Sequence, residues 1–281
     1  MRCPRTGCQP SSLRVPRGGR RSHLAGLLAW LAASPALAAD EPPAAGIRPE
    51  RFAGPVPATL SLPLVPPLPL SPHRGRFGRP VAAVVLLHDS LGPDPRGEAY
   101  ALQLLGAGIA VLELLEAGLA PPVLAEAVRA LAADPRIDAA RLGVLGFGQG
   151  AAGALAGELG VAARAAIYPG CAALAAAAQR PPPDGWDGQP VLLLHGGADQ
   201  ANPPAACIAA AGRLAAAGAV VHRIEYRGAS YAWDHPGFGL DHRLLLERPD
   251  GGGRVEVRPW PALAAVSAAQ VAAFFARELA P

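Results

Sequence analysis

A glycine-rich segment at residues 141–155, R-L-G-V-L-G-F-G-Q-G-A-A-G-A-L, restricts the folds that are open to this chain. Its first half contains a continuous apolar run at 142–147, which is typical of a buried strand. Its second half is alanine-rich, which favours a helix. Since a buried strand that enters a helix through a tight turn is the repeating unit of α/β proteins, we expect strands and helices to alternate on both sides of this segment.

The rest of the chain repeats this pattern. Apolar and β-branched runs predict strands at 81–87, 109–114, 142–147, 164–168, 191–194 and 220–226. The intervening and final segments predict helices at 96–106, 123–133, 151–158, 204–217 and 262–279. This alternation predicts one α/β domain with a mostly parallel sheet and helices on both faces. Ligands bind such sheets at the carboxyl ends of the strands, so the chemistry is expected there.

The first 38 residues read as an export signal. Six arginines precede an apolar run at 24–33, and an A-x-A cleavage motif follows at 36–38. The apolar run is too short to span a bilayer, and a disordered basic tail is the alternative interpretation. We therefore expect a periplasmic or secreted protein, with Sec or Tat export left open. Residues 39–72 are predicted to be a linker with N-terminal edge strands, and 73–281 the α/β domain.

The net charge depends on this leader. Its removal takes away six arginines and no acidic residue, which turns the formal charge of +3 into −3. Nucleic-acid binders keep a basic patch, so the mature chain is not expected to bind nucleic acid. The sequence has no cysteine or histidine cluster with metal-ligand spacing, and we expect neither a metal nor a cofactor.

Two of the four cysteines, Cys171 and Cys207, remain after the leader is removed. In an oxidising compartment such a pair is a candidate disulfide. The positions of both residues near the carboxyl ends of consecutive predicted strands favour the pairing. Free thiols, with Cys171 as a nucleophile, remain the alternative.

The glycine turn matches two functional motifs. Residues 146–150 fit the nucleophile elbow G-x-S-x-G with glycine in the serine position, and 148–153 fit the dinucleotide fingerprint G-x-G-x-x-G. A dinucleotide fingerprint follows the first strand of its unit and needs an acidic residue about 20 positions later. Here the turn follows a later strand, and the next strand ends in Y-P-G without an acid, so the elbow is favoured. A third interpretation, that the glycines only permit close packing, fits either motif.

Further segments accompany the elbow in a fixed order: V-V-L-L-H-D-S-L-G at 84–92, D-P-R-I-D at 134–138, L-H-G-G-A-D at 194–199 and R-G-A-S-Y-A-W-D at 227–234. With them, the chain from about residue 81 to its end resembles the dienelactone hydrolase family of the α/β-hydrolases. The resemblance implies the α/β-hydrolase fold and hydrolysis of small esters or lactones. It places the nucleophile, the acid and the histidine at Gly148, Asp199 and Tyr231, in the order that α/β-hydrolases use.

Only Asp199 matches the family at these three positions. Gly148 has no hydroxyl or thiol, and tyrosine, with an ordinary pKa of about 10, is a poor base at neutral pH. We therefore predict that covalent hydrolysis is lost or severely weakened. A pseudoenzyme that binds a small apolar or carboxylated ligand is one hypothesis. The alternative is a divergent ester hydrolase that uses another nucleophile or water activated by Asp199.

The resemblance also suggests supporting residues. Oxyanion donors are expected from Gln149 and the Asp89–Ser90 loop. Independently of the resemblance, Trp186 and Trp233 are candidates for the walls of an apolar ligand cleft, with simple packing of loops as the alternative interpretation. The candidates for replacing the missing groups, each with a structural role as the alternative, are His235, Ser230, Ser90, His88, Cys171 and His195. The expected partner is a small-molecule ester, lactone or ligand, and the oligomeric state is left open.

Overall fold

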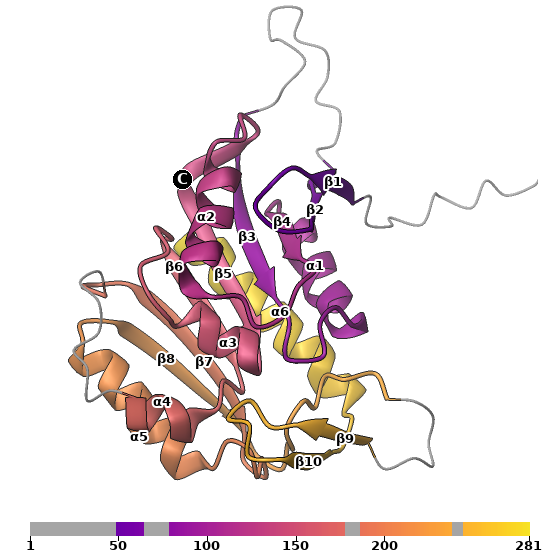
Figure 1. The fold of residues 1–281 in the computed structure, drawn as a ribbon, viewed down its shortest axis with the longest axis vertical. Helices are drawn as coiled ribbons and strands as arrows, with labels where there is room; N and C mark the ends of the chain where they lie inside the picture. Colours follow the sequence, from indigo (N-terminus) through magenta and orange to yellow (C-terminus); the bar gives the residue numbers. More distant parts are fainter. Residues whose placement is uncertain (1–48, 65–78, 178–185, 238–243) are drawn as a thin grey trace, which may run out of the picture. The chain divides into compact units, whose positions relative to one another are not determined.

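The computed structural model describes residues 49–64, 79–177, 186–237 and 244–281 (Figure 1). The predicted export signal and two parts of the predicted linker, 39–48 and 65–72, lie outside the described residues. One compact unit spans residues 46–281. Within the described ranges, no helix is long and apolar enough to cross a lipid bilayer.

Eight strands in this part of the chain form one sheet in the order β1-β2-β4-β3-β5-β6-β7-β8. The strands are β1 (Glu50–Phe52), β2 (Ala58–Ser61), β3 (Val81–Leu87), β4 (Ala110–Leu114), β5 (Ile137–Phe147), β6 (Ala163–Ile167), β7 (Pro190–Gly196) and β8 (Val220–Tyr226). The run from β4 to β8 is parallel, and β1 and β2 add an antiparallel edge beside β4. The predicted mostly parallel sheet is confirmed.

Helices cover both faces of this sheet. They are α1 (Pro95–Gly106), α2 (Pro121–Ala132), α3 (Gln149–Ala154), α4 (Cys171–Ala177), α5 (Pro204–Ala216) and α6 (Pro261–Glu278). Successive side chains of a strand point to opposite faces. Accordingly Val84 and Leu86 of β3 join the core beneath α1 and α6, whereas Val85 and Leu87 join the core beneath α2. Figure 1 shows α6 behind the sheet and α2 and α3 in front of it.

Several elements differ from the sequence prediction. Helix α4 and the hairpin of β9 (Leu244–Glu247) and β10 (Arg254–Val257) were not predicted. Helix α4 is short and mostly alanine, so its sequence shows no alternation of apolar and polar residues with the period of a helix. The strands β9 and β10 have four residues each, which is too few for a clear alternating pattern. Helix α3 ends at Ala154 rather than 158, shortly before Gly157 takes a left-handed φ of 66°.

Candidate functional site

The glycine turn at the end of β5 has the geometry of a nucleophile elbow. Gly148 stands between β5 and α3 with φ 52° and ψ −115°, a backbone conformation that glycine adopts far more easily than other residues. A Cβ atom on Gly146 would collide with the Gly150 carbonyl, and one on Gly150 would collide with the His88 carbonyl. These two glycines therefore let the strand and the helix meet closely, while Gly148 makes the turn.

The space above Gly148 is filled. A Cβ atom on Gly148 would lie 2.5 Å from the Tyr231 hydroxyl oxygen and 2.9 Å from the Asp89 Cβ atom. Tyr231 is only 1% exposed and Asp89 only 3% exposed. The structure thus brings the predicted nucleophile and histidine positions together, but the tyrosine occupies the volume that a nucleophilic side chain would need.

Asp199, the residue expected as the acid, follows β7 and is 3% exposed. Its Oδ1 accepts hydrogen bonds from the backbone N–H groups of Ala201 (2.7 Å) and Asn202 (3.0 Å), and its Oδ2 accepts one from Asn202 Nδ2 (3.0 Å). Among the described residues it makes no hydrogen bond to Tyr231. The carboxylate therefore stabilises the turn that follows β7. It does not orient Tyr231, the residue at the histidine position.

Burial raises the pKa of Asp199 from 3.8 to about 6, against the opposing effect of its hydrogen bonds to Asn202 and Ala201. Since the folded state holds this proton more tightly than the unfolded chain, the carboxyl stabilises the fold below pH 4. That contribution, about 3 kcal/mol, is lost as pH rises through 6. We expect Asp199→Asn to remove this part of the pH dependence. Urea unfolding at pH 4 to 7 measures it, and parallel profiles for the two proteins would contradict the assignment.

Tyr231 is protonated at neutral pH. Burial raises the pKa of its phenol well above 10, and the nearby Asp89 carboxylate raises it further. Within the described part of the chain, its hydroxyl has no hydrogen-bond partner. A neutral, unpartnered phenol cannot accept a proton from a nucleophile, so this residue is not suited to act as the general base.

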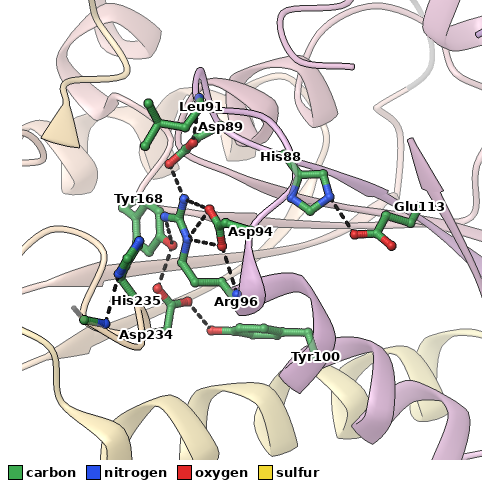
Figure 2. Close-up of polar contacts among 11 residues, drawn as sticks. His88, Asp89, Leu91, Asp94, Arg96, Tyr100, Glu113, Tyr168, Asp234 and His235 are labelled. Carbon is green, nitrogen blue, oxygen red and sulfur yellow. Dashed lines mark hydrogen bonds and ion pairs between the residues drawn. The ribbon is translucent and has the colours of Figure 1, made fainter. Parts of the chain in front are cut away.

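Figure 2 shows a buried polar network that the sequence did not reveal. It lies beside Tyr231, since the ring centroids of Tyr168 and Tyr231 are 4.8 Å apart. Arg96, 2% exposed, forms ion pairs with Asp89 (2.6 Å) and Asp94. Its Nη1 donates to the Tyr168 hydroxyl (3.2 Å), which donates to Asp234 Oδ1 (2.7 Å). The side chain of Asp89 therefore forms an ion pair with Arg96. An oxyanion site at this loop would have to use its backbone N–H groups.

Asp234 closes this network on the side of α1. It accepts a second hydrogen bond, 2.6 Å long, from the Tyr100 hydroxyl, which also contacts Ser267 (2.9 Å). Burial raises the pKa of Asp234 above its ordinary value, and Arg96 with the two tyrosine hydroxyls opposes the rise. The network, defined here as the Arg96 network, joins the loop after β3, the end of β6 and the loop that carries Tyr231.

Most of the residues considered as replacements for the missing groups have structural contacts. His88 Nε2 pairs with Glu113 (2.8 Å), His195 Nε2 lies 2.6 Å from Arg223, and His235 Nδ1 accepts from the backbone of Gly237 (3.1 Å). The Ser230 hydroxyl lies within hydrogen-bond distance of backbone groups of Tyr231 and Arg258. Ser90 is exposed on its loop.

Cys171 is not a free thiol, because it forms a disulfide with Cys207. The bond joins the first residue of α4 to α5, and both cysteines are fully buried. The predicted pairing is confirmed. Asn202 supports the same region, since its side-chain oxygen accepts hydrogen bonds from the backbone N–H groups of Gly170 (2.7 Å) and Cys171 (3.0 Å).

The structure does not bring the two predicted aromatic walls together. Trp233 is fully buried, with its indole N–H directed to Ser267 and its ring against Tyr168. Trp186 is 4% exposed and packs against the Arg164 guanidinium. Arg164 lies near the amino end of β6, whereas Gly148 follows the carboxyl end of β5, so the ring and the elbow lie at opposite ends of the parallel strands. Both rings pack in the core because their large apolar surfaces are covered there.

A pocket of about 270 Å³ lies beside the elbow. It lies between α3, the start of α2 and the segment after β4, and its lining includes Leu87, Glu116, Leu119, Leu124, Gln149 and Gly153. Of the residues expected in the site, it includes Gln149 and His88 but none of the three triad positions. No group of three or more His, Cys, Asp or Glu side chains that could hold a metal occurs in the described ranges.

No protein-family model matches the chain, and no curated protein matches its sequence. Solved structures do match. The Pyrobaculum calidifontis esterase is 14% identical, with a TM-score of 0.57 over 83% of this chain and 86% of that one. An esterase domain from a Rhodothermus marinus protein is 18% identical, with a TM-score of 0.54 over 83% of this chain and 99% of that one.

A Mycobacterium tuberculosis puromycin-hydrolyzing peptidase is also similar, at 16% identity and a TM-score of 0.55 over 83% of this chain. The chain spans only 39% of that protein's length, and 36% of another puromycin hydrolase. At these identities the likeness concerns the fold. Together with the sheet order, it confirms the α/β-hydrolase fold. The more specific resemblance to dienelactone hydrolases stays a prediction.

Proposed function

We propose that this protein is an α/β-hydrolase-fold protein that binds a small molecule without cleaving it covalently. The observation that carries the proposal is the position of the Tyr231 hydroxyl, 2.5 Å from where a side chain on Gly148 would begin. The chain shares its fold with esterases, so a hydrolase-type ancestry is supported. The elbow is retained, but a phenol occupies the place of the nucleophile.

Ester hydrolysis through a triad needs a nucleophile, a base that takes its proton and an acid that orients the base. Gly148 supplies no nucleophilic atom, and Tyr231 keeps its proton at neutral pH. Asp199 accepts hydrogen bonds from its own turn. Each of the three roles is therefore unfilled.

The alternative is a divergent hydrolase with another nucleophile or with water activated by Asp199. The disulfide removes the Cys171 thiol as a nucleophile, and the Ser230 hydroxyl contacts backbone groups. Water activation would require access to Asp199, which is 3% exposed and hydrogen-bonded at both oxygens. These contacts favour the non-hydrolytic protein.

Restoring two residues tests the proposal. We expect wild type neither to turn over p-nitrophenyl acetate nor to react with a fluorophosphonate probe. Gly148→Ser/Tyr231→His should react with the probe and hydrolyse the ester at least tenfold faster than wild type, because the shorter side chain frees the space above the elbow. Gly148→Ser alone should gain nothing, since its side chain meets the Tyr231 hydroxyl.

The control for this gain is Asp199→Ala in the double variant, which should abolish it if the imidazole depends on the acid. Backbone donors alone can accelerate hydrolysis roughly 10³–10⁴-fold over water in triad-deleted enzymes. A weak wild-type signal therefore contradicts the proposal only if a serine or thiol reagent blocks it. Circular dichroism shows whether each variant is folded.

A further inference from the structure

The pocket beside the elbow has the position and lining of a small-molecule site. It lies at the carboxyl ends of β3, β4 and β5, the edge at which open α/β sheets bind ligands. Its volume of about 270 Å³ is many times the minimum of about 10–15 Å³ that a single water needs. The site could therefore hold a small molecule even though the elbow itself is covered.

Most of the lining is apolar. Leu87, Leu119 and Leu124 contribute aliphatic side chains. Gly153 of α3 adds no side chain, and a Cβ atom there would have one neighbour within 4 Å, a methyl carbon of Leu87 at 3.9 Å. The open space next to Gly153 makes it a position from which the pocket can be filled without disturbing the backbone.

Two polar side chains, Glu116 and Gln149, also line the pocket. Both are exposed, and among the described residues neither has a hydrogen-bond or ion-pair partner. His88 is also part of the lining, but its imidazole is bonded to Glu113. Among the described lining residues, Glu116 is therefore the acidic side chain left without a partner, and it favours a cationic ligand over a carboxylated one, which is one of the classes expected from the sequence.

We infer that this pocket binds a small primary amine with an apolar body, the ammonium group bound by the Glu116 carboxylate and the Gln149 carboxamide oxygen. The body packs against the leucines. An ammonium group offers three donors and no acceptor, which matches these two oxygen-bearing groups. The inference rests on the proposed function, since it names the ligand class of a protein that binds without cleaving.

Phenethylamine, 2-phenylethanol and phenylacetate are the probes, as a cation, a neutral analogue and an anion of similar size. Ligand-observed NMR with the full-length chain at pH 7 measures their affinities. Wild type should bind the amine at least tenfold more tightly than phenylacetate. Glu116→Gln should weaken the amine at least threefold, as expected for an ion pair near the surface, and change 2-phenylethanol less than twofold.

Gly153→Leu should weaken both the amine and the alcohol at least tenfold, because its side chain fills the pocket. The matched control Gly153→Ala should change them less than threefold and keep the helix folded. Phenylacetate binding as tight as amine binding, amine binding unaffected by Gly153→Leu, or no amine binding at millimolar concentration would each overturn the inference. Wild-type ester turnover with probe labelling would instead overturn the proposed function, whatever the amine result.

Discussion

Replacing Arg96 with methionine is expected to lower the free energy of unfolding by about 3–5 kcal/mol, because breaking a buried ion pair leaves an uncompensated charge. Arg96 is 2% exposed and pairs with Asp89, itself 3% exposed. Through Tyr168 it also supports Asp234, which is 6% exposed. Methionine has a similar length but no charge or donor. Urea unfolding followed by circular dichroism measures the loss.

Arg136→Met is the matched control. Its side chain is 32% exposed, and its guanidinium forms ion pairs with Glu50 and Asp134 near the surface. Pairs of this kind contribute about 0–1 kcal/mol, so the control should lose no more than that. Equal losses of unfolding free energy at the two positions would show that the Arg96 network contributes no more to stability than a surface ion pair.

Adding Asp89→Asn to Arg96→Met should recover part of the stability, because it removes one of the charges left without a partner. Residues in one hydrogen-bonded network show coupling of about 0.5–3 kcal/mol, and we expect a value in this range. Additive losses from the two substitutions would show that the ion pair between these residues is not the source of the effect.

Removing the disulfide with Cys171→Ala/Cys207→Ala is expected to lower the free energy of unfolding by about 4 kcal/mol, the loop-entropy value for a bridge of this span. The cysteines are separated by 36 residues. The loss arises mainly because the unfolded chain gains conformational freedom. Alanine is chosen because both sites are fully buried and alanine adds no polar group there.

Wild type treated with a reductant during urea unfolding should lose the same amount, whereas the alanine double variant should not respond to the reductant. This comparison separates the covalent link from any packing change. A wild-type unfolding midpoint that is identical with and without reductant would mean that the bond does not hold the folded state. Mass spectrometry of the oxidised protein confirms that the link is present before the measurement.

The main elements were predictable because their patterns are local. Strands β3 and β8 begin and end at the predicted residues, and α1, α2, α5 and α6 differ by one or two residues at their ends. Each reflects an apolar run or a helical period of several residues. Helix α4 and the β9–β10 hairpin escaped because alanine repeats and four-residue strands give no comparable signal.

The candidate site was only partly predictable. The order of Gly148, Asp199 and Tyr231 along the chain led to the elbow, and the structure places Tyr231 directly over Gly148. The sequence offered no signal for the pairing of Arg96 with Asp234 through Tyr168, because these residues are 138 positions apart. The sequence also contained no signal that Trp186 lies far from Gly148. A residue in a loop beside a predicted strand can pack at either end of the strands, and the local sequence does not specify which.

By itself, then, the sequence determined the α/β alternation, the glycine turn and the absence of a nucleophile at its centre, since each depends on residue type and local spacing. Only the tertiary structure decided what fills the elbow: the Tyr231 phenol and the Arg96 network on one side, and an open pocket on the other. Packing between distant segments sets these volumes and charge pairs, and no local period encodes them.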